Sequence, residues 1–405
     1  MEKDLKILVV DDSVTERQIL SKIVSNIEYA ELVGIAPNGK IALSKIELKQ
    51  PDLILLDVIM PEMDGLETLK QIKKKHPHID VIMLSGLDQE TANTTMKALE
   101  TGALDFIPKP RNPSVEHNVE ELRITLSRLV PMARARKYSR QARGISGPGG
   151  TEKVFKPAQA PTELKPIQTR EPVLPEKDKF SEKKPYVVSK PEPVKIPIEK
   201  RPIRKTGKVD VVAIGVSTGG PNALQEIIPK FDKSFPVPIL VVQHMPVMFT
   251  ASLAARLDNL SAITVVEGKE GQQVEKGVMY IAPGGSHMVV RKDKFKNTVL
   301  GLVDSPPVNS CRPSVDVLFR SVALVYGGNV LTTILTGMGN DGVSGVSAIR
   351  RKGGFSIVQD EKTSLIWGMP GSVVSADQAD AIVPIDVMAS KIMRIVEMRD
   401  SDAED

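Results

Sequence analysis

The sequence predicts an α/β protein with two separate parallel sheets. Short apolar runs alternate with amphipathic stretches over residues 1–130, and the same alternation begins again at residue 208. This pattern is typical of βαβ units, whose parallel strands are covered on both faces. Residues 138–207 separate the two halves, and eleven prolines fall between Pro148 and Pro202. Such a segment buries too little apolar surface to offset its ordering entropy, so we expect a flexible linker between two domains.

The first domain, residues 1–130, is expected to contain a five-stranded parallel sheet. Its strands are predicted at 6–10, 32–36, 53–58, 81–84 and 105–107, and its helices near 14–27, 39–49, 65–75, 90–101 and 115–130.

The second domain, residues 208–398, is expected to be doubly wound and mostly parallel, followed by an acidic tail at 399–405. Closely spaced short strands within 271–303 leave no room for helices, so this stretch is predicted to form an antiparallel hairpin. The strands are predicted at 209–214, 238–242, 262–266, 278–281, 288–291, 299–303, 330–335, 355–358 and 381–383. The helices are predicted near 221–230, 247–258, 313–326, 342–352, 370–376 and 387–398.

Composition excludes several classes of protein. No window approaches eighteen unbroken apolar residues, and the N-terminal apolar run is short and ends in acids, so neither a transmembrane helix nor a signal peptide is expected. A single cysteine, Cys311, excludes a disulfide within one chain and zinc sites built from several cysteines. We therefore expect a cytoplasmic protein that is not an integral membrane protein.

The net charge of +4 is unevenly distributed. Residues 134–208 hold 20 Lys and Arg against 8 Asp and Glu, whereas the rest of the chain holds 34 against 42. A DNA-binding output domain should carry its own basic face, so this distribution argues against nucleic-acid binding. The basic segment is read as a linker. Alternatives are a docking segment that orders on a partner and contact with an anionic membrane surface.

Polar side chains end the strands predicted in the first domain. Asp11 and Asp12 follow the first strand, Asp57 ends the third, Ser85 follows the fourth, and Lys109 follows the fifth. Carboxyl ends of parallel strands meet at one edge, where adjacent carboxylates need a cation and suit Mg²⁺. A carboxylate beside a metal and a lysine can accept a phosphoryl group. Any single one of these aspartates could instead be a solvated turn residue.

Four motifs in this region resemble the receiver domain of two-component response regulators, over about residues 4–130. They are D-D at 11–12, L-D-V-I-M-P-E-M-D-G at 56–65, S-G at 85–86 and F-I-P-K-P at 106–110. The resemblance implies a flavodoxin-like fold.

The same resemblance implies roles for six residues. Asp57 would be the phosphoacceptor and would hold Mg²⁺ together with Asp11 and Asp12, while Lys109 would contact the phosphoryl group. Ser85 and Phe106 would rearrange on phosphorylation, with Phe106 standing where many relatives carry Tyr.

The second domain opens on the stretch V-D-V-V-A-I-G-V-S-T-G-G-P-N-A-L at 209–224. This stretch is an apolar run followed by a turn of small residues and the beginning of a helix. Such an arrangement places the hydroxyl of Ser217 at the edge of the sheet. The turn matches G-x-S-x-G, which exposes a serine nucleophile beside backbone N–H groups. By itself the turn could equally cradle a phosphate or cap a helix.

A serine nucleophile needs a base, and this domain offers two histidines. His244 follows the strand after Ser217 and is therefore expected within its reach. His287 lies in A-P-G-G-S-H-M-V-V and is interpreted as a turn or structural histidine.

The acid that orients the base is sought at a third strand end. Asp341 follows the run 330–335 in the glycine-rich turn T-G-M-G-N-D-G. It could also serve as a helix N-cap, which does not exclude catalysis. Asp316 and Asp360 have equally good structural interpretations.

The order Ser217, His244, Asp341 differs from that of α/β-hydrolases. Residues 208–385 instead resemble the catalytic domain of the chemotaxis protein-glutamate methylesterases, the CheB family, in which a receiver precedes the catalytic domain. The matching motifs are G-V-S-T-G-G-P at 215–221, Q-H-M-P at 243–246, A-P-G-G-S-H at 282–287, R-P-S-V-D-V-L-F at 312–319, T-G-M-G-N-D-G at 336–342, Q-D at 359–360 and G-M-P-G at 368–371.

The resemblance implies a phosphorylation-regulated serine hydrolase that demethylates glutamyl γ-methyl esters of chemoreceptors and deamidates selected glutamines. Ser217 would be the nucleophile, His244 the base and Asp341 its orienting acid. Thr218 would shape the site, and backbone N–H groups near Ser217 and Met338 would stabilise the oxyanion. No cofactor is expected for the hydrolysis.

The resemblance also implies partners and control. The partners would be methyl-accepting chemoreceptors as substrate and a chemotaxis histidine kinase as phosphodonor, with recruitment to receptor arrays. From domain order alone we hypothesise that the unmodified receiver covers the catalytic cleft. Two other functions remain open, a receiver with a non-catalytic ligand- or partner-binding output and a transcriptional regulator.

Overall fold

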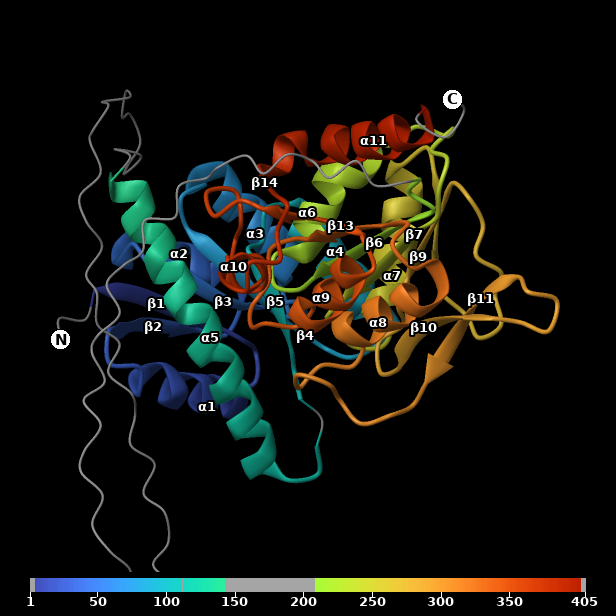
Figure 1. Cartoon of the computed structure of the whole chain (residues 1–405). Helices are drawn as coiled ribbons and strands as arrows, with labels where there is room; N and C mark the ends of the chain where they lie inside the picture. The colour runs from blue at the N-terminus through green and yellow to red at the C-terminus, as the bar shows by residue number, and fades with distance from the viewer. Residues whose placement is uncertain (1–3, 111, 143–207, 402–405) are drawn as a thin grey trace, which may run out of the picture.

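The computed structural model describes residues 4–110, 112–142 and 208–401, which form two α/β domains (Figure 1). The expected linker therefore lies mostly outside the described residues. In the described part of the chain, no helix is both long and apolar enough to cross a membrane.

The first domain has the expected five-stranded parallel sheet, in the order β2-β1-β3-β4-β5. Its elements are β1 (Leu5–Val10), α1 (Val14–Ser25), β2 (Ala30–Ala36), α2 (Gly39–Lys49), β3 (Leu53–Asp57), α3 (Gly65–Lys75), β4 (Asp80–Ser85), α4 (Gln89–Glu100), β5 (Asp105–Pro108) and α5 (Val115–Ala142). The central strands are almost wholly apolar and fully buried, as expected of a sheet covered on both faces.

Helix α5 is twelve residues longer than predicted and runs through Pro131. The prediction was wrong because proline usually ends a helix, whereas here Met132 and Ala133 pack into the core beyond it. Arg134 and Arg140 then pair with Asp4 and Asp80. Part of the basic segment therefore belongs to the first domain and is neutralised by it.

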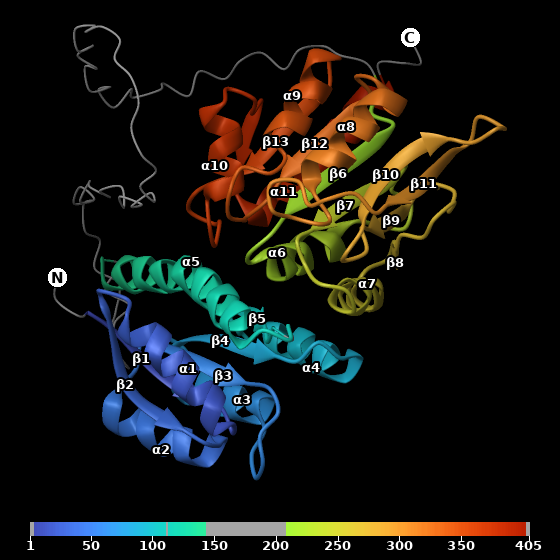
Figure 2. The ribbon, with the colours of Figure 1, turned by 90° about the horizontal axis from the view of Figure 1, so that it is seen from below.

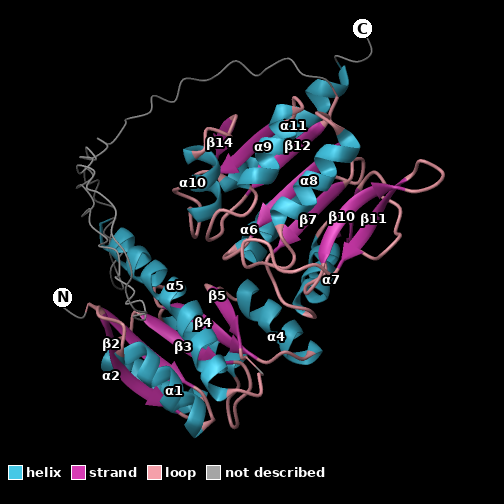
Figure 3. Cartoon of the chain, turned by 60° about the horizontal axis from the view of Figure 1, so that its bottom comes forward, coloured by secondary structure: helices cyan, strands magenta, loops and turns pink. Residues whose placement is uncertain are grey.

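The second domain has a seven-stranded sheet in the order β14-β13-β12-β6-β7-β9-β8. Figure 3 shows the strands of this domain in magenta, with its helices in cyan packed around them. Its strands are β6 (Val211–Val216), β7 (Ile239–Gln243), β8 (Thr264–Glu267), β9 (Val278–Ile281), β12 (Val330–Ile334), β13 (Phe355–Gln359) and β14 (Ala381–Val383). All their pairings are parallel. The doubly wound prediction is confirmed.

Helices cover both faces of this sheet. One face carries α6 (Gly220–Ile227) with the short 3₁₀ turn η1 (Ile228–Lys230), α7 (Phe249–Leu260) and α11 (Ile385–Ser401). The other carries α8 (Val315–Tyr326), α9 (Val343–Arg351) and α10 (Gly368–Ser375). Helix α11 extends into the expected acidic tail, and residues 402–405 lie outside the described residues.

The antiparallel prediction for 271–303 holds except at β9, since Gln273 also forms an antiparallel bridge with Val299. Strands β10 (His287–Lys292) and β11 (Thr298–Val303) form a separate antiparallel pair. Strand β9 instead joins the main sheet in parallel between β7 and β8. Spacing along the chain could not distinguish these strands, because all three are short and apolar.

Candidate active site

Ser217 lies on the turn that leaves β6, the central strand of the second sheet. Its backbone N–H donates to Thr336 O at 3.0 Å, and its carbonyl accepts from Gly220 N at 2.8 Å. Gly219 adopts a positive φ of 75°, which an L side chain would strain. The tight turn therefore begins α6 at once and leaves the serine at the edge of the sheet.

Gln243 holds the serine turn against the next strand end. Its buried side-chain amide donates to the carbonyls of Ser217 and His244 at 2.9 and 3.1 Å. The backbone N–H of His244 also donates to Val216 O at 3.1 Å. Sequence reasoning gave Gln243 no role, although the residue stands in the motif Q-H-M-P.

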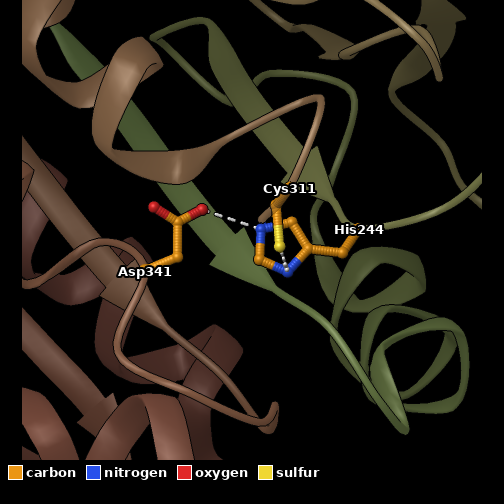
Figure 4. A group of neighbouring side chains, drawn as sticks. All are labelled: His244, Cys311 and Asp341. Atoms are coloured by element: carbon orange, nitrogen blue, oxygen red, sulfur yellow. Dashed lines mark hydrogen bonds and ion pairs between the residues drawn. The ribbon is translucent and has the colours of Figure 1, made fainter. Parts of the chain in front are cut away.

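His244 and Asp341 are hydrogen-bonded in the structure. The Nε2 atom of His244 lies 2.8 Å from Oδ2 of Asp341 (Figure 4). Nε2 must carry the proton of this bond because a carboxylate only accepts, so Nδ1 is the nitrogen left to act as a base. The Sγ atom of Cys311 lies 3.5 Å from this Nδ1 atom.

The hydroxyl of Ser217 makes no hydrogen bond to His244 or to any other group among the residues that the structure describes. The two side chains follow neighbouring strands, since Val216 at the end of β6 is paired with Gln243 at the end of β7. Catalytic hydrogen bonds are often long without substrate and tighten in the complex.

Asp341 is buried and is fixed by four groups besides His244. Its carboxylate accepts from Asn309 Nδ2 and Ser314 Oγ at 2.8 Å each, and from the backbone N–H groups of Val315 and Asp316 at 2.7 and 3.1 Å. The last two are the orphan donors at the start of α8. Asp341 therefore caps the N-terminus of α8. The sequence-based alternative, that Asp341 is a helix N-cap, is correct in kind, but the capped helix is α8 and not α9, which follows Asp341 in the chain.

Asp316 makes the reciprocal contact from the first turn of α8. Its Oδ1 accepts from Gly342 N at 3.1 Å and Gly345 N at 2.7 Å at the start of α9. Its structural interpretation is thus confirmed. Asp360 accepts from Thr363 N at 3.1 Å in a local turn, as a structural acid would.

The pair of Asp341 and His244 shifts the pKa values of both groups. Burial alone would raise the pKa of Asp341, but the hydrogen bond from His244, its charge and the donors from Asn309 and Val315 lower it to about 2. Burial would lower the pKa of His244, but the hydrogen bond to Asp341 and contact with Cys311 raise it to about 9. The imidazolium form is therefore strongly favoured.

His287 is wholly buried and structural, in agreement with its interpretation from sequence. Its Nδ1 accepts from Ser314 N at 3.1 Å, and its Nε2 lies 3.2 Å from Pro306 O. Because Ser314 Oγ donates to Asp341, His287 supports the loop that orients the acid.

Thr218 and Met338 lie on the turns that follow β6 and β12. The Thr218 carbonyl accepts from Thr336 Oγ1 at 3.0 Å, and Met338 lines a cavity of about 670 Å³ together with residues of α5 and 361–367. Neither backbone N–H has a partner among the hydrogen bonds of the described residues.

The strand-end residues of the first domain also meet. Lys109 Nζ lies 2.9 Å from Asp11 Oδ2, 2.8 Å from Asp57 Oδ2 and 2.5 Å from Glu16 Oε2. Burial raises the pKa of Asp11 to about 7 and also raises that of Asp57, with Lys109 opposing both shifts. Because the two buried carboxylates of Asp11 and Asp57 share one lysine, their negative charge favours binding of a further cation.

Asp11, Asp12 and Asp57 fit a divalent cation, because one oxygen of each lies within 4.8 Å of the others. Carboxylate oxygens are the ligands that Mg²⁺ prefers. Ser85 is buried beside them and lies 2.6 Å, oxygen to oxygen, from the hydroxyl of Thr95. Phe106 points into the second domain, where it stacks on Phe249 with ring centroids 4.6 Å apart.

The chain is similar to known proteins over nearly its whole length. Models described as CheB methylesterase and as Response regulator receiver domain match residues 212–392 and 7–118. A protein-glutamate methylesterase/protein-glutamine glutaminase of Trichodesmium erythraeum is 42% identical over 390 residues, which are 96% of this chain and 98% of the relative. The chain belongs to the CheB methylesterase family.

Two further proteins named as CheB methylesterases, or as protein-glutamate methylesterases, are similar to this chain. A protein of the same name from Desulfotalea psychrophila is 38% identical and covers 98% of this chain and 100% of its own. A crystal structure of the Thermotoga maritima CheB methylesterase catalytic domain is 41% identical, with a TM-score of 0.45, and covers 47% of this chain and 100% of that one. Membership in this family favours a hydrolytic output over non-catalytic binding.

Proposed function

We propose that this chain is a protein-glutamate methylesterase and protein-glutamine glutaminase of chemotaxis, acting on chemoreceptors at their arrays. The observation that carries the proposal is the buried pair of His244 and Asp341 at two strand ends beside the serine of the β6 turn. In this assignment hydrolysis belongs to residues 208–398 and control to the receiver.

In this mechanism Ser217 Oγ attacks the γ-carbonyl carbon of a methylated glutamyl residue, and His244 Nδ1 accepts its proton. Asp341 holds the Nε2–H tautomer and stabilises the imidazolium. The imidazolium then returns the proton to the departing methanol oxygen. Water resolves the acyl-enzyme by the same steps and leaves glutamate. With a glutamine substrate, ammonia leaves instead.

The oxyanion is assigned to backbone N–H groups near Ser217 and Met338, with Thr218 shaping the pocket. The unpartnered N–H groups of Thr218 and Met338 support this assignment. Each such donor is typically worth roughly 3–4 kcal/mol in the transition state.

Methanol release from methylated receptor fragments tests the nucleophile. Ser217→Ala should lose most of the rate, leaving at most roughly 10³–10⁴-fold over water. Ser390→Ala is a matched control, because Ser390 is exposed on α11 and its hydroxyl bonds only to Val387 O. Release near the wild-type rate from Ser217→Ala would reject the assignment.

Control is assigned to phosphorylation of Asp57 by a chemotaxis histidine kinase. Asp11, Asp12 and Asp57 would hold Mg²⁺, which neutralises charge developing on the transferred phosphoryl group. Lys109 is positioned to bind the phosphoryl oxygens, since it already contacts Asp57. Ser85 and Phe106 are assigned to the switch.

Contacts between the domains support inhibition by the unmodified receiver. Helix α4 lies beside α7 (Figure 2), Glu100 pairs with Arg256, and Gln89 Nε2 donates to Ser252 Oγ at 2.7 Å. Asn222 Nδ2 on α6 donates to Ala103 O at 3.4 Å, and the carboxylate of Asp105 lies close enough to the backbone N–H of Gly219, two residues after the proposed nucleophile, for this group to lower its pKa. The receiver therefore touches the serine turn itself.

Methanol release with and without a small phosphodonor and Mg²⁺ tests this control. The wild-type chain should accelerate with the donor, whereas Asp57→Asn should not respond. Phe106→Ala should raise the rate without donor, because it removes the ring stacked on Phe249. Equal rates for all three chains in both conditions would reject phosphorylation control while leaving the hydrolytic assignment intact.

A further inference from the structure

Cys311 contacts the base of the active site, although the hydrolysis described above does not use it. Its Sγ lies 3.5 Å from Nδ1 of His244, the ring nitrogen that Asp341 leaves free (Figure 4). The thiol is half-buried, and the His244 side chain is 11% exposed.

The loop between β11 and α8 holds Cys311 rigidly in this place. Val308 and Cys311 exchange both backbone hydrogen bonds, at 3.1 and 2.9 Å. Asn309 and Ser310 between them adopt positive φ angles of 53° and 62°. Asn309 then donates to Asp341 at 2.8 Å, so one tight turn fixes the thiol relative to the His244–Asp341 pair.

We propose that Cys311 Sγ and His244 Nδ1 form a binding site for a soft divalent cation of the Zn²⁺ class, which inhibits the esterase. Binding is independent of the proposed function, whereas inhibition rests on the role of His244 as the base. The remaining coordination positions would be taken by water or substrate, as in open zinc sites.

The separation of the two ligand atoms suits this class of ion. Zn–S and Zn–N bonds of about 2.3 and 2.0–2.1 Å at a tetrahedral angle place sulfur and nitrogen about 3.6 Å apart. The observed separation is 3.5 Å, so the distance between the two atoms already matches that expected when both bind one ion. Thiolate and imidazole are ligands that select Zn²⁺ over Mg²⁺.

Asp341 completes the arrangement from the far side of the ring. A histidine that binds a metal usually donates its other N–H to a carboxylate, which fixes its orientation and strengthens it as a ligand. Asp341 accepts from Nε2 at 2.8 Å and is itself fixed by four further donors. The same carboxylate that prepares His244 as a base therefore prepares it as a metal ligand.

A bound cation would stop catalysis directly, because it occupies the lone pair that must accept the proton of Ser217. The chain would then have two cation sites of opposite character. The oxygen site at Asp11, Asp12 and Asp57 supports phosphorylation, and the sulfur–nitrogen site at Cys311 and His244 opposes hydrolysis.

Titration of the full-length protein with Co²⁺ tests binding. Thiolate coordination gives a charge-transfer absorption in the near ultraviolet, and Cys311 is the only cysteine of the chain, so such a band identifies its ligand. The wild type and Asp12→Asn should both show the band, since Asp12 belongs to the oxygen site. Cys311→Ser should not show it. A wild type without the band, or Cys311→Ser with it, would overturn the proposal.

Inhibition is measured as methanol release with excess Mg²⁺ and increasing Zn²⁺, compared for each protein with its own metal-free rate. We expect the wild type to be inhibited reversibly by a chelator, and Cys311→Ser to need at least ten-fold more Zn²⁺. Equal sensitivity of the two proteins would overturn the inhibitory site. A cobalt band in a wild type that Zn²⁺ does not inhibit would also overturn it, and would count against His244 as the base.

Discussion

Replacement of Asp341 by Asn should move the pH dependence of the esterase toward acid. In the wild type, burial alone would lower the pKa of His244, but the hydrogen bond to Asp341, the contact with Cys311 and the charge of Asp341 raise it to about 9. Only neutral imidazole can accept the serine proton, so kcat/KM should rise with pH until the free enzyme reaches this pKa.

The structure sets the size of the effect. A shift from 6.5 to about 9 corresponds to about 3 kcal/mol in favour of the imidazolium. At pH 7 only about 1% of His244 is then neutral, so kcat/KM should rise about fifty-fold between pH 7 and 9. Because the folded pKa of His244 is raised, its contribution to stability is fully present below pH 6.5 and is lost as pH rises through about 9. The contribution of Asp341, whose pKa is lowered, is present above pH 3.8 and is lost as pH falls through about 2.

Asp341→Asn keeps the size of the side chain but removes its charge, so the pKa of His244 should fall below its wild-type value, with the contact with Cys311 still opposing burial. The rise in kcat/KM from pH 7 to 9 should then be smaller than in the wild type, at a much lower rate because the Nε2–H tautomer is no longer enforced. The assay is methanol release corrected by the Ser217→Ala rate at each pH. A wild-type profile flat over this range, or a variant profile that breaks at higher pH, would refute the reasoning.

Four further outcomes are expected. Gly337→Ala should reduce kcat strongly without abolishing folding, because its Cβ would lie 2.7 Å from Cβ of Ser217; an unchanged kcat would contradict this packing. Gln243→Ala should lower stability by roughly 1–3 kcal/mol, measured by urea unfolding, since two buried carbonyls lose a donor. Asn309→Ala should lower kcat more than it changes KM, because a donor that orients Asp341 is lost, and a pure KM effect would argue against that role. Burial raises the pKa of Asp105 to about 7, with the N–H groups of Phe106 and Gly219 opposing the shift. If undocking restores the usual value of 3.8, docking should strengthen about ten-fold from pH 8 to 6. As the pH falls from 8 to 6, the ratio of phosphodonor-stimulated to basal methanol release should therefore grow in the wild type. In Asp105→Asn the same ratio should stay constant.

The sequence alone determined both sheets, nearly every helix and the position of the candidate site residues. Parallel strands buried on both faces are continuous apolar runs, and the residues that end them must meet at one edge. This reasoning is enough to place Asp57 beside Lys109, and His244 beside Asp341. The same reasoning misplaced β9 and ended α5 at Pro131, because tertiary packing and ion pairs override local signals.

Only the tertiary structure decided how the site is supported. Gln243, Asn309 and Ser314 orient the candidate catalytic groups through individual side-chain hydrogen bonds, which leave no periodic pattern in a sequence. Cys311 was read from sequence only as the absence of disulfides, because its contact with His244 joins residues 67 positions apart. The contact of Asp105 with Gly219 likewise depends on how two domains meet. Periodicity records which face of an element is buried, whereas the partner of each polar atom is fixed only when distant segments pack together.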